Sequence, residues 1–140
     1  LAFASKTFAY QEVAPSRADI REAQLIEIEP KKQAMALRIV ERGNGGAREV
    51  LRVYVLKGSR FESIFAAEVA KEQGSKRLTT QILFTRRGAS TDIVLTPQPP
   101  VGYSAASYAD LPAEDVVPIL LPWQDKKTKF VYKAGQFTKE

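Results

Sequence analysis

Residues 78–85 read Leu-Thr-Thr-Gln-Ile-Leu-Phe-Thr and form the clearest strand pattern in the chain. β-Branched and aromatic residues dominate this stretch, and such residues favour strands because they pack well on a pleated, half-buried surface. Successive side chains of a strand point to opposite faces, so Leu78, Ile82 and Phe84 share one face. The stretch therefore predicts a β-rich fold.

Similar alternating runs lie on both sides of this strand. They cover residues 24–29, 35–40, 50–55, 61–65 and 92–96, and a terminal pair covers residues 128–132 and 136–139. Turn sequences separate the runs, and the strongest is Arg-Gly-Asn-Gly-Gly at residues 42–46, because glycine and asparagine accept positive φ. Both faces of residues 50–55 are largely apolar, which is typical of a central strand. We expect an all-β fold, an antiparallel sandwich or barrel-like meander of about 6–9 short strands.

The length of 140 residues fits a single β-rich domain that spans residues 1–140. Within it, residues 97–115 lose the alternation and gain proline, serine, alanine, glycine and tyrosine, which indicates a long loop. Loops of this length in compact domains are usually functional or flexible. The apolar run at residues 116–123 contains two prolines, which confine it to an edge or an extended crossing, where it could dock on a neighbouring chain.

Two segments leave alternatives open. Residues 66–73 contain good helix formers and precede Gly74, so they fit either one short helix or the end of a strand. The first five residues fit a signal-peptide remnant, a trimmed terminus or the first strand. The strand is favoured, because Phe8 and Tyr10 continue the apolar pattern.

The chain contains no cysteine and no histidine. The usual ligands of zinc, haem, iron–sulfur and copper sites are therefore missing, and neither a metal site nor a cofactor is expected. Ser–His–Asp and Cys–His catalytic groups are likewise impossible within the chain. Carboxylates could act without histidine, but no spacing brings two of them into one cleft, so a carboxylate-based hydrolase is only a third interpretation.

The net charge is +5, which suits either an ordinary solvated surface or a polyanion-binding one. Arg42 lies in one turn, and Arg86 and Arg87 lie in another. If the two turns share one end of the sheet, the three arginines could bind an anion.

The long loop carries a second set of candidate binding residues. Tyr103 and Tyr108 flank Ser-Ala-Ala-Ser, and this mixture resembles the adaptable chemistry of binding loops. The alternative is that both tyrosines pin the loop onto the sheet. Trp123 follows at the end of the apolar run.

The closing segment combines aromatic and basic residues. Phe130, Tyr132 and Phe137 alternate as in a hairpin, among Lys126, Lys127, Lys129 and Lys133. Single-stranded nucleic acid is bound by such stacking and phosphate attraction. The alternation favours the other interpretation, in which the aromatic rings point inward and the lysines are solvated.

Residues 121–137 also resemble the closing hairpin of bacterial secreted or lipoprotein-type β domains, which often reads Tyr-x-Trp-x-Gly-x-x-Phe. Here Tyr132 stands for the tryptophan and Ala134 for the usual Asp or Asn. The resemblance implies a periplasmic, outer-membrane-associated or extracellular setting, while a cytoplasmic one stays open. It implies no catalytic residue.

Together these patterns predict a protein that is not an enzyme. The favoured interpretation is a structural or interaction module of a bacterial cell-envelope or secreted assembly, with another protein or a neighbouring domain as its partner. The alternative is a module that binds an anionic glycan or single-stranded nucleic acid through its basic surface. No apolar stretch is long enough for a membrane span.

Overall fold

The computed structural model describes residues 18–43, 45–109 and 115–140, and these contain eight strands. The strands are β1 (Ala18–Glu29), β2 (Lys32–Gly43), β3 (Gly46–Lys57), β4 (Arg60–Gln73), β5 (Lys76–Arg87), β6 (Ser90–Pro97), β7 (Thr128–Lys133) and β8 (Gln136–Lys139). Apart from the strand predicted at the N-terminus, the predicted strand regions fall within these elements. Several strands run longer than expected, because the sheet continues up to tight turns.

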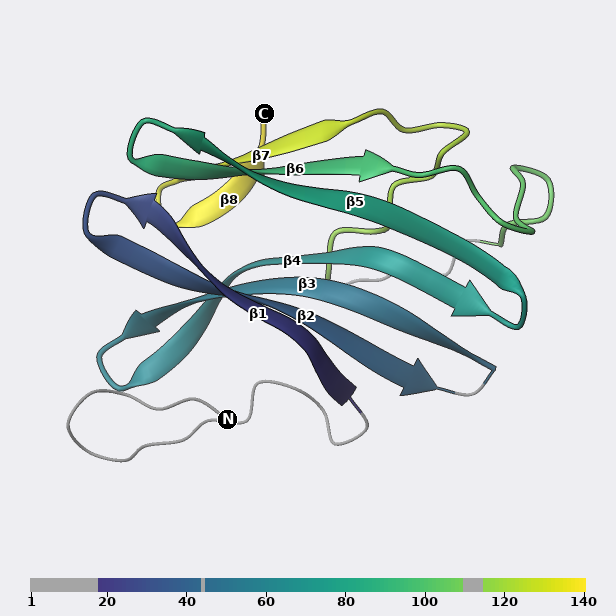
Figure 1. Cartoon of the computed structure of the whole chain (residues 1–140), viewed down its shortest axis with the longest axis horizontal. Coiled ribbons are helices and arrows are strands. Elements are labelled where there is room, and N and C mark those ends of the chain that lie inside the picture. The colour runs from purple at the N-terminus through teal and green to yellow at the C-terminus, as the bar shows by residue number, and fades with distance from the viewer. Residues whose placement is uncertain (1–17, 44, 110–114) are drawn as a thin grey trace.

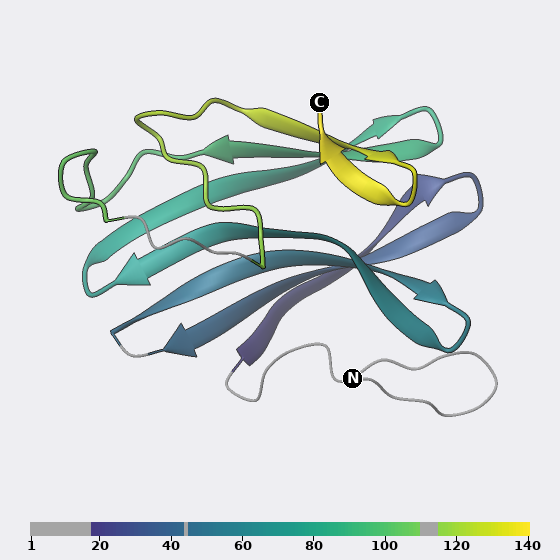
Figure 2. The same ribbon diagram turned by 180° about the vertical axis from the view of Figure 1, so that it is seen from behind.

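All neighbouring strands are antiparallel, and the sheet follows the chain in the order β1-β2-β3-β4-β5-β6-β7-β8 without closing into a barrel. The meander bends into two layers, with β1–β4 in one and β5–β8 in the other (Figures 1 and 2). The bend lies between β4 and β5, which pair only from Ala70–Gln73 to Lys76–Thr79. The all-β antiparallel fold predicted from the sequence is confirmed.

Turn residues explain where the strands reverse. Lys31 adopts a φ of 62° in the turn after Pro30, between the paired residues Glu29 and Lys32. Gly58 has the same φ of 62° between the paired residues Lys57 and Arg60. Because hairpins alternate along a meander, β2–β3 and β4–β5 turn at one end of the molecule, and the other hairpins turn at the opposite end (Figure 1).

The core lies between the two layers. β3 is central in its layer, as predicted, and buries Leu51, Val53 and Val55. Phe65 of β4 meets the rings of Phe130 and Phe137 from the other layer, with centroids 4.9 Å and 5.8 Å away. Burial of these apolar side chains is the main force that holds the layers together.

Residues 66–73 form the end of β4, so the short helix is not present. Ala67 and Val69 are almost fully buried in the core, and Val69 is an extra residue opposite β3, since Val50 pairs with Glu68 and Glu49 with Ala70. Sheet pairing and burial outweigh the modest helix preference of this segment. The predicted first strand near residues 2–10 lies outside the described residues.

The long connection between β6 and β7 returns across the edges of the sheet (Figure 2). Val101 bridges to Arg77, and Val117 forms a parallel bridge to Ala67. The apolar run is thus an extended crossing, as its prolines indicated. Val116 and Ile119 are buried in this fold, so their side chains do not offer a surface to a neighbouring chain.

Candidate functional site

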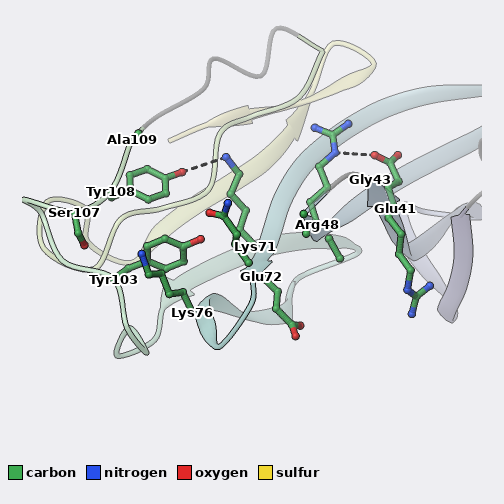
Figure 3. Close-up of a pocket in the computed structure, with 15 residues that line it drawn as sticks. Glu41, Gly43, Arg48, Lys71, Glu72, Lys76, Tyr103, Ser107, Tyr108 and Ala109 are labelled. Atoms are coloured by element: carbon green, nitrogen blue, oxygen red, sulfur yellow. Dashed lines mark hydrogen bonds and ion pairs between the residues drawn. The ribbon is translucent and has the colours of Figure 1, made fainter.

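An open pocket of about 490 Å³ lies where the β2–β3 hairpin, the β4–β5 hairpin and the loop around residues 103–109 meet (Figure 3). Three segments that are far apart in the sequence build its wall. Pockets of this volume are in the usual range for small-molecule or peptide-side-chain sites. This makes the hairpin end the candidate functional site.

Two tyrosine–lysine contacts fix the loop side of the pocket. The Lys71 ammonium donates a hydrogen bond of 3.1 Å to the Tyr108 hydroxyl, and Lys76 lies 5.7 Å from the centre of the Tyr103 ring (Figure 3). The two tyrosine rings meet edge to face with their centres 5.5 Å apart. On the other side of Tyr108, the centre of the Trp123 ring lies 5.7 Å from the centre of the Tyr108 ring. The tyrosines therefore pin the loop to β4 and β5, and they also line the pocket.

The opposite side of the pocket is an ion-pair network. Arg48 donates to Glu41 across 2.7 Å and approaches Glu68 at 3.5 Å and Asp115 at 3.4 Å. Glu68 is almost fully buried, and its carboxylate also lies 3.5 Å from Lys71. A buried carboxylate needs such partners, because desolvation without them is costly.

The pKa values follow from these contacts. Burial alone would lower the pKa of Lys71, but the hydrogen bond to Tyr108 and the charge of Glu68 outweigh it and raise that pKa. Burial alone would raise the pKa of Asp115, but a backbone hydrogen bond and the charge of Arg48 lower it. Both shifts favour the charged form of the side chain, which the ion pairs of this site stabilise.

Charge is nearly balanced around the pocket. Four cationic side chains and two carboxylates line it: Arg42, Arg48, Lys71, Lys76, Glu41 and Glu72. Three further carboxylates pair with these cations from outside, namely Asp19, Glu68 and Asp115. The site is therefore polar and aromatic rather than strongly basic.

The structure brings together only some of the predicted site residues. Arg42, Tyr103 and Tyr108 all line the pocket, and Trp123 supports it from behind. Arg86 and Arg87 belong to the β5–β6 hairpin at the opposite end, so the idea of one anion patch shared with Arg42 is wrong (Figure 1). Each is also paired, Arg86 with Glu27 at 2.8 Å and Arg87 with Asp92 at 3.1 Å.

The closing hairpin follows the interpretation with inward rings. Phe130, Tyr132 and Phe137 are buried in the core, so Tyr132 offers no surface for base stacking. Among the described residues, the Tyr132 hydroxyl accepts a hydrogen bond from Lys32. The lysines stand outside: Lys126, Lys127 and Lys133 are exposed, and Lys129 pairs with Glu140 at 2.8 Å.

Lys71, Lys76 and Glu41 were not foreseen as site residues. They belong to strand ends that look like ordinary solvated positions. The bend between β4 and β5 brings Lys71 and Lys76 beside the loop, and Glu41 of β2 lies on the facing wall of the pocket. A weak signal existed, because lysine recurs on both sides of the Gly74 turn.

Comparison of the chain with protein-family models, with curated proteins and with solved structures finds no match. In the parts of the chain that the structure describes, no group of three or more acidic side chains is placed to hold a metal ion. The same parts contain no helix with the length and apolarity to cross a membrane.

Replacing Tyr108 with phenylalanine removes the acceptor of the Lys71 hydrogen bond and keeps the ring. We expect a loss of about 1 kcal/mol, concentrated in the loop, because the half-buried Lys71 ammonium loses one of its two partners among the described residues and keeps only Glu68. Hydrogen exchange at the Ser107 and Tyr108 amides, which bond to the Ser104 carbonyl, measures the change. Tyr103→Phe is the matched control, since its hydroxyl has no hydrogen bond within the described residues; equal exchange in both variants would contradict the anchoring role.

Proposed function

We propose that this protein is a non-enzymatic interaction module that binds another protein or a neighbouring domain through the pocket at its hairpin end. The observation that carries the proposal is the joint placement of Arg42, Tyr103 and Tyr108 in one open pocket. Tyrosine and arginine are enriched where proteins recognise one another, because they combine a large contact area with hydrogen bonding.

A protein partner suits the site better than a polyanion does. The arginines that a polyanion would need are already paired with carboxylates, and the pocket itself is close to electroneutral. A non-enzymatic role is supported by the absence of histidine and cysteine from the sequence.

The proposed setting is a bacterial cell-envelope or secreted assembly. Its support is the resemblance of residues 121–137 to the closing hairpins of such domains. The inward rings of Tyr132 and Phe137, 5.6 Å apart, are compatible with that hairpin pattern.

Selection from a displayed library of random peptides tests the interaction function. We expect the purified chain to enrich binding peptides whose synthetic forms shift the amide NMR signals of Lys76, Tyr103 and Tyr108. Lys76→Glu should weaken these peptides about tenfold or more, because it reverses a charge at the pocket wall.

Lys133→Glu is the matched control, since it makes the same charge change at the β7–β8 hairpin, at the other end of the molecule. Two outcomes would contradict the proposal. One is that no peptide is enriched, and the other is that enriched peptides bind both variants equally. A parallel assay measures binding of a sulfated oligosaccharide and of single-stranded DNA. Binding of either one that disappears at high salt would favour the polyanion alternative.

A further inference from the structure

A second, smaller apolar cluster lies on the outer face of the β1–β4 layer, the face turned away from β5–β8. This outer cluster consists of Leu37, Ile39 and Tyr54, with Met35 and Phe61 packed against them. Ala36 of β2 belongs to the core between the layers. Because successive side chains of a strand point to opposite faces, Leu37 and Ile39 point away from that core. Met35 pairs with Tyr54 across β2 and β3, so both strands contribute to one patch.

The centre of the outer cluster is buried although it lies on the outer face. Leu37 is 2% exposed and Ile39 is 0% exposed. On the same face, Leu25 and Leu56 at the margins are 65% and 45% exposed. A bare sheet face leaves its side chains partly in water, as it does at Leu25 and Leu56. The centre of the cluster is therefore covered, and small clusters of this kind are typically found under a segment that crosses a sheet.

The cover belongs to the chain itself. The exposures are those of a single chain, so a second copy is not needed to bury Leu37 and Ile39. The β5–β8 layer packs against the opposite face of β1–β4 (Figures 1 and 2). At the rim of the cluster Asp115 approaches Arg52, the cross-strand partner of Leu37, but the Asp115 side chain is itself 60% exposed. A cover over the centre therefore has to come from another part of the chain.

The segment before β1 has the composition of such a cover. Residues 1–10 read Leu-Ala-Phe-Ala-Ser-Lys-Thr-Phe-Ala-Tyr, with three aromatic side chains and one charge. Residues 110–114, the other longer segment outside the described ranges, offer only Leu111 as a large apolar side chain. Aromatic side chains gain free energy when they leave water and pack on apolar ones. Composition therefore favours residues 1–10.

The distance to the outer cluster also suits this segment. Ala18, the first residue of β1, pairs with Glu41, which is two residues from Ile39 and four from Leu37 along β2. A strand rises about 3.3 Å per residue, so these positions lie about 7 Å and about 13 Å along the sheet from that pair. The eight residues from Tyr10 to Ala18 span up to about 26 Å when extended. The aromatic residues of the segment are thus within reach of the cluster.

We propose that the segment of residues 1–17 folds back over the outer face of the β1–β4 layer and covers the outer cluster with its aromatic side chains. The segment acts as a strap that closes apolar surface, which would otherwise favour self-association. The outer cluster and the hairpin-end pocket are separate surfaces, so the pocket can bind a partner whether or not the strap is present.

A spin label tests where the segment lies in the full chain. The sequence contains no cysteine, so Gln11→Cys accepts a single nitroxide label. We expect the amide NMR signals of Leu37, Ile39 and Val50 to lose most of their intensity, because the unpaired electron broadens the signals of nearby nuclei. Gln81→Cys is the matched control, since Gln81 is exposed on β5 in the other layer and a label there should leave these signals unchanged.

A pair of substitutions tests the aromatic contacts. Phe8→Ser combined with Tyr10→Ser should uncover the cluster, shift the signals of Leu37 and Ile39, and raise the fluorescence of a dye that binds apolar surface several-fold. Lys6→Ser combined with Gln11→Ser is the matched control, because it changes two polar positions of the same segment. The control should match the unchanged chain in both measurements.

Four outcomes would overturn the strap. The first is that the Gln11→Cys label leaves the three signals intact, and the second is that both pairs of substitutions behave alike. The third is broadening in a mixture of spin-labelled chains and isotope-enriched unlabelled chains, which would assign the cover to a second copy. The fourth is broadening from a label on Ala113→Cys alone, which would assign it to residues 110–114.

Discussion

Replacing Phe65 with alanine should lower the free energy of unfolding by about 3–5 kcal/mol, the typical cost of truncating a buried phenylalanine. Phe65 is buried on β4 and meets both Phe130 and Phe137 of the other layer edge to face. Its removal leaves a cavity and also breaks aromatic contacts that are worth more than their area alone. Because the rings join the two layers, the sheet cannot collapse around the gap from one side.

Chemical denaturation of the purified chain, followed by tryptophan fluorescence, measures this loss. Leu83→Ala is the control, because Leu83 belongs to β5 and is 46% exposed, so its truncation should cost well under 1 kcal/mol. A Phe65→Ala variant as stable as Leu83→Ala would show that the aromatic cluster does not hold the layers together.

Local sequence patterns were enough to predict the hairpins. A tight turn and two alternating runs specify antiparallel neighbours, and the predicted turns near Arg42 and near Arg86 each join two strands that pair. The division of the sheet into two layers was harder to predict from the sequence, because it depends on β4 and β5 separating after four paired positions. Nothing local marks that point, and the sequence of residues 66–73 fits a short helix as well as a strand end. The burial of Ala67 and Val69 in the folded chain decides for the strand.

The residues of the candidate site could likewise be predicted only in part from the sequence. The chemistry of Arg42, Tyr103 and Tyr108 indicated binding positions, and the fold brings them together. The grouping with Arg86 and Arg87 was wrong because it neglected the order of turns in a meander. Three strands, β3, β4 and β5, lie between the two turns, and an odd number of strands puts the turns at opposite ends. Lys71 and Lys76 were not predicted as site residues, because only their tertiary contacts with the loop distinguish them from other surface lysines.

Replacing Gly46 with alanine should destabilise the chain by about 1–3 kcal/mol, the usual cost of forcing extra volume into a packed site. A Cβ atom at this position would lie 2.4 Å from the Glu72 carbonyl oxygen and 3.5 Å from the Glu72 carbonyl carbon. Both obstacles are backbone, so no side chain can rotate away. The β2–β3 and β4–β5 hairpins would have to move apart.

Gly43→Ala is a close control, because Gly43 pairs with Gly46 across the same hairpin and a Cβ there meets nothing within 4 Å. This change should be neutral or stabilising by up to about 1 kcal/mol, since alanine restricts the unfolded chain. Denaturation midpoints of the two variants provide the comparison. Equal stability would mean that the two hairpins do not touch at Gly46.

The close approach of Gly46 to the Glu72 backbone also affects the shape of the pocket. Gly46, Glu72 and Lys76 all line the site, so separating the two hairpins moves one wall of the pocket away from Tyr103 and Tyr108. We therefore expect Gly46→Ala to weaken any pocket-binding peptide. The denaturation midpoint measures independently whether weaker binding comes from general unfolding instead. The absence of a side chain at Gly46 is thus a requirement for the shape of the pocket as well as for the stability of the sheet.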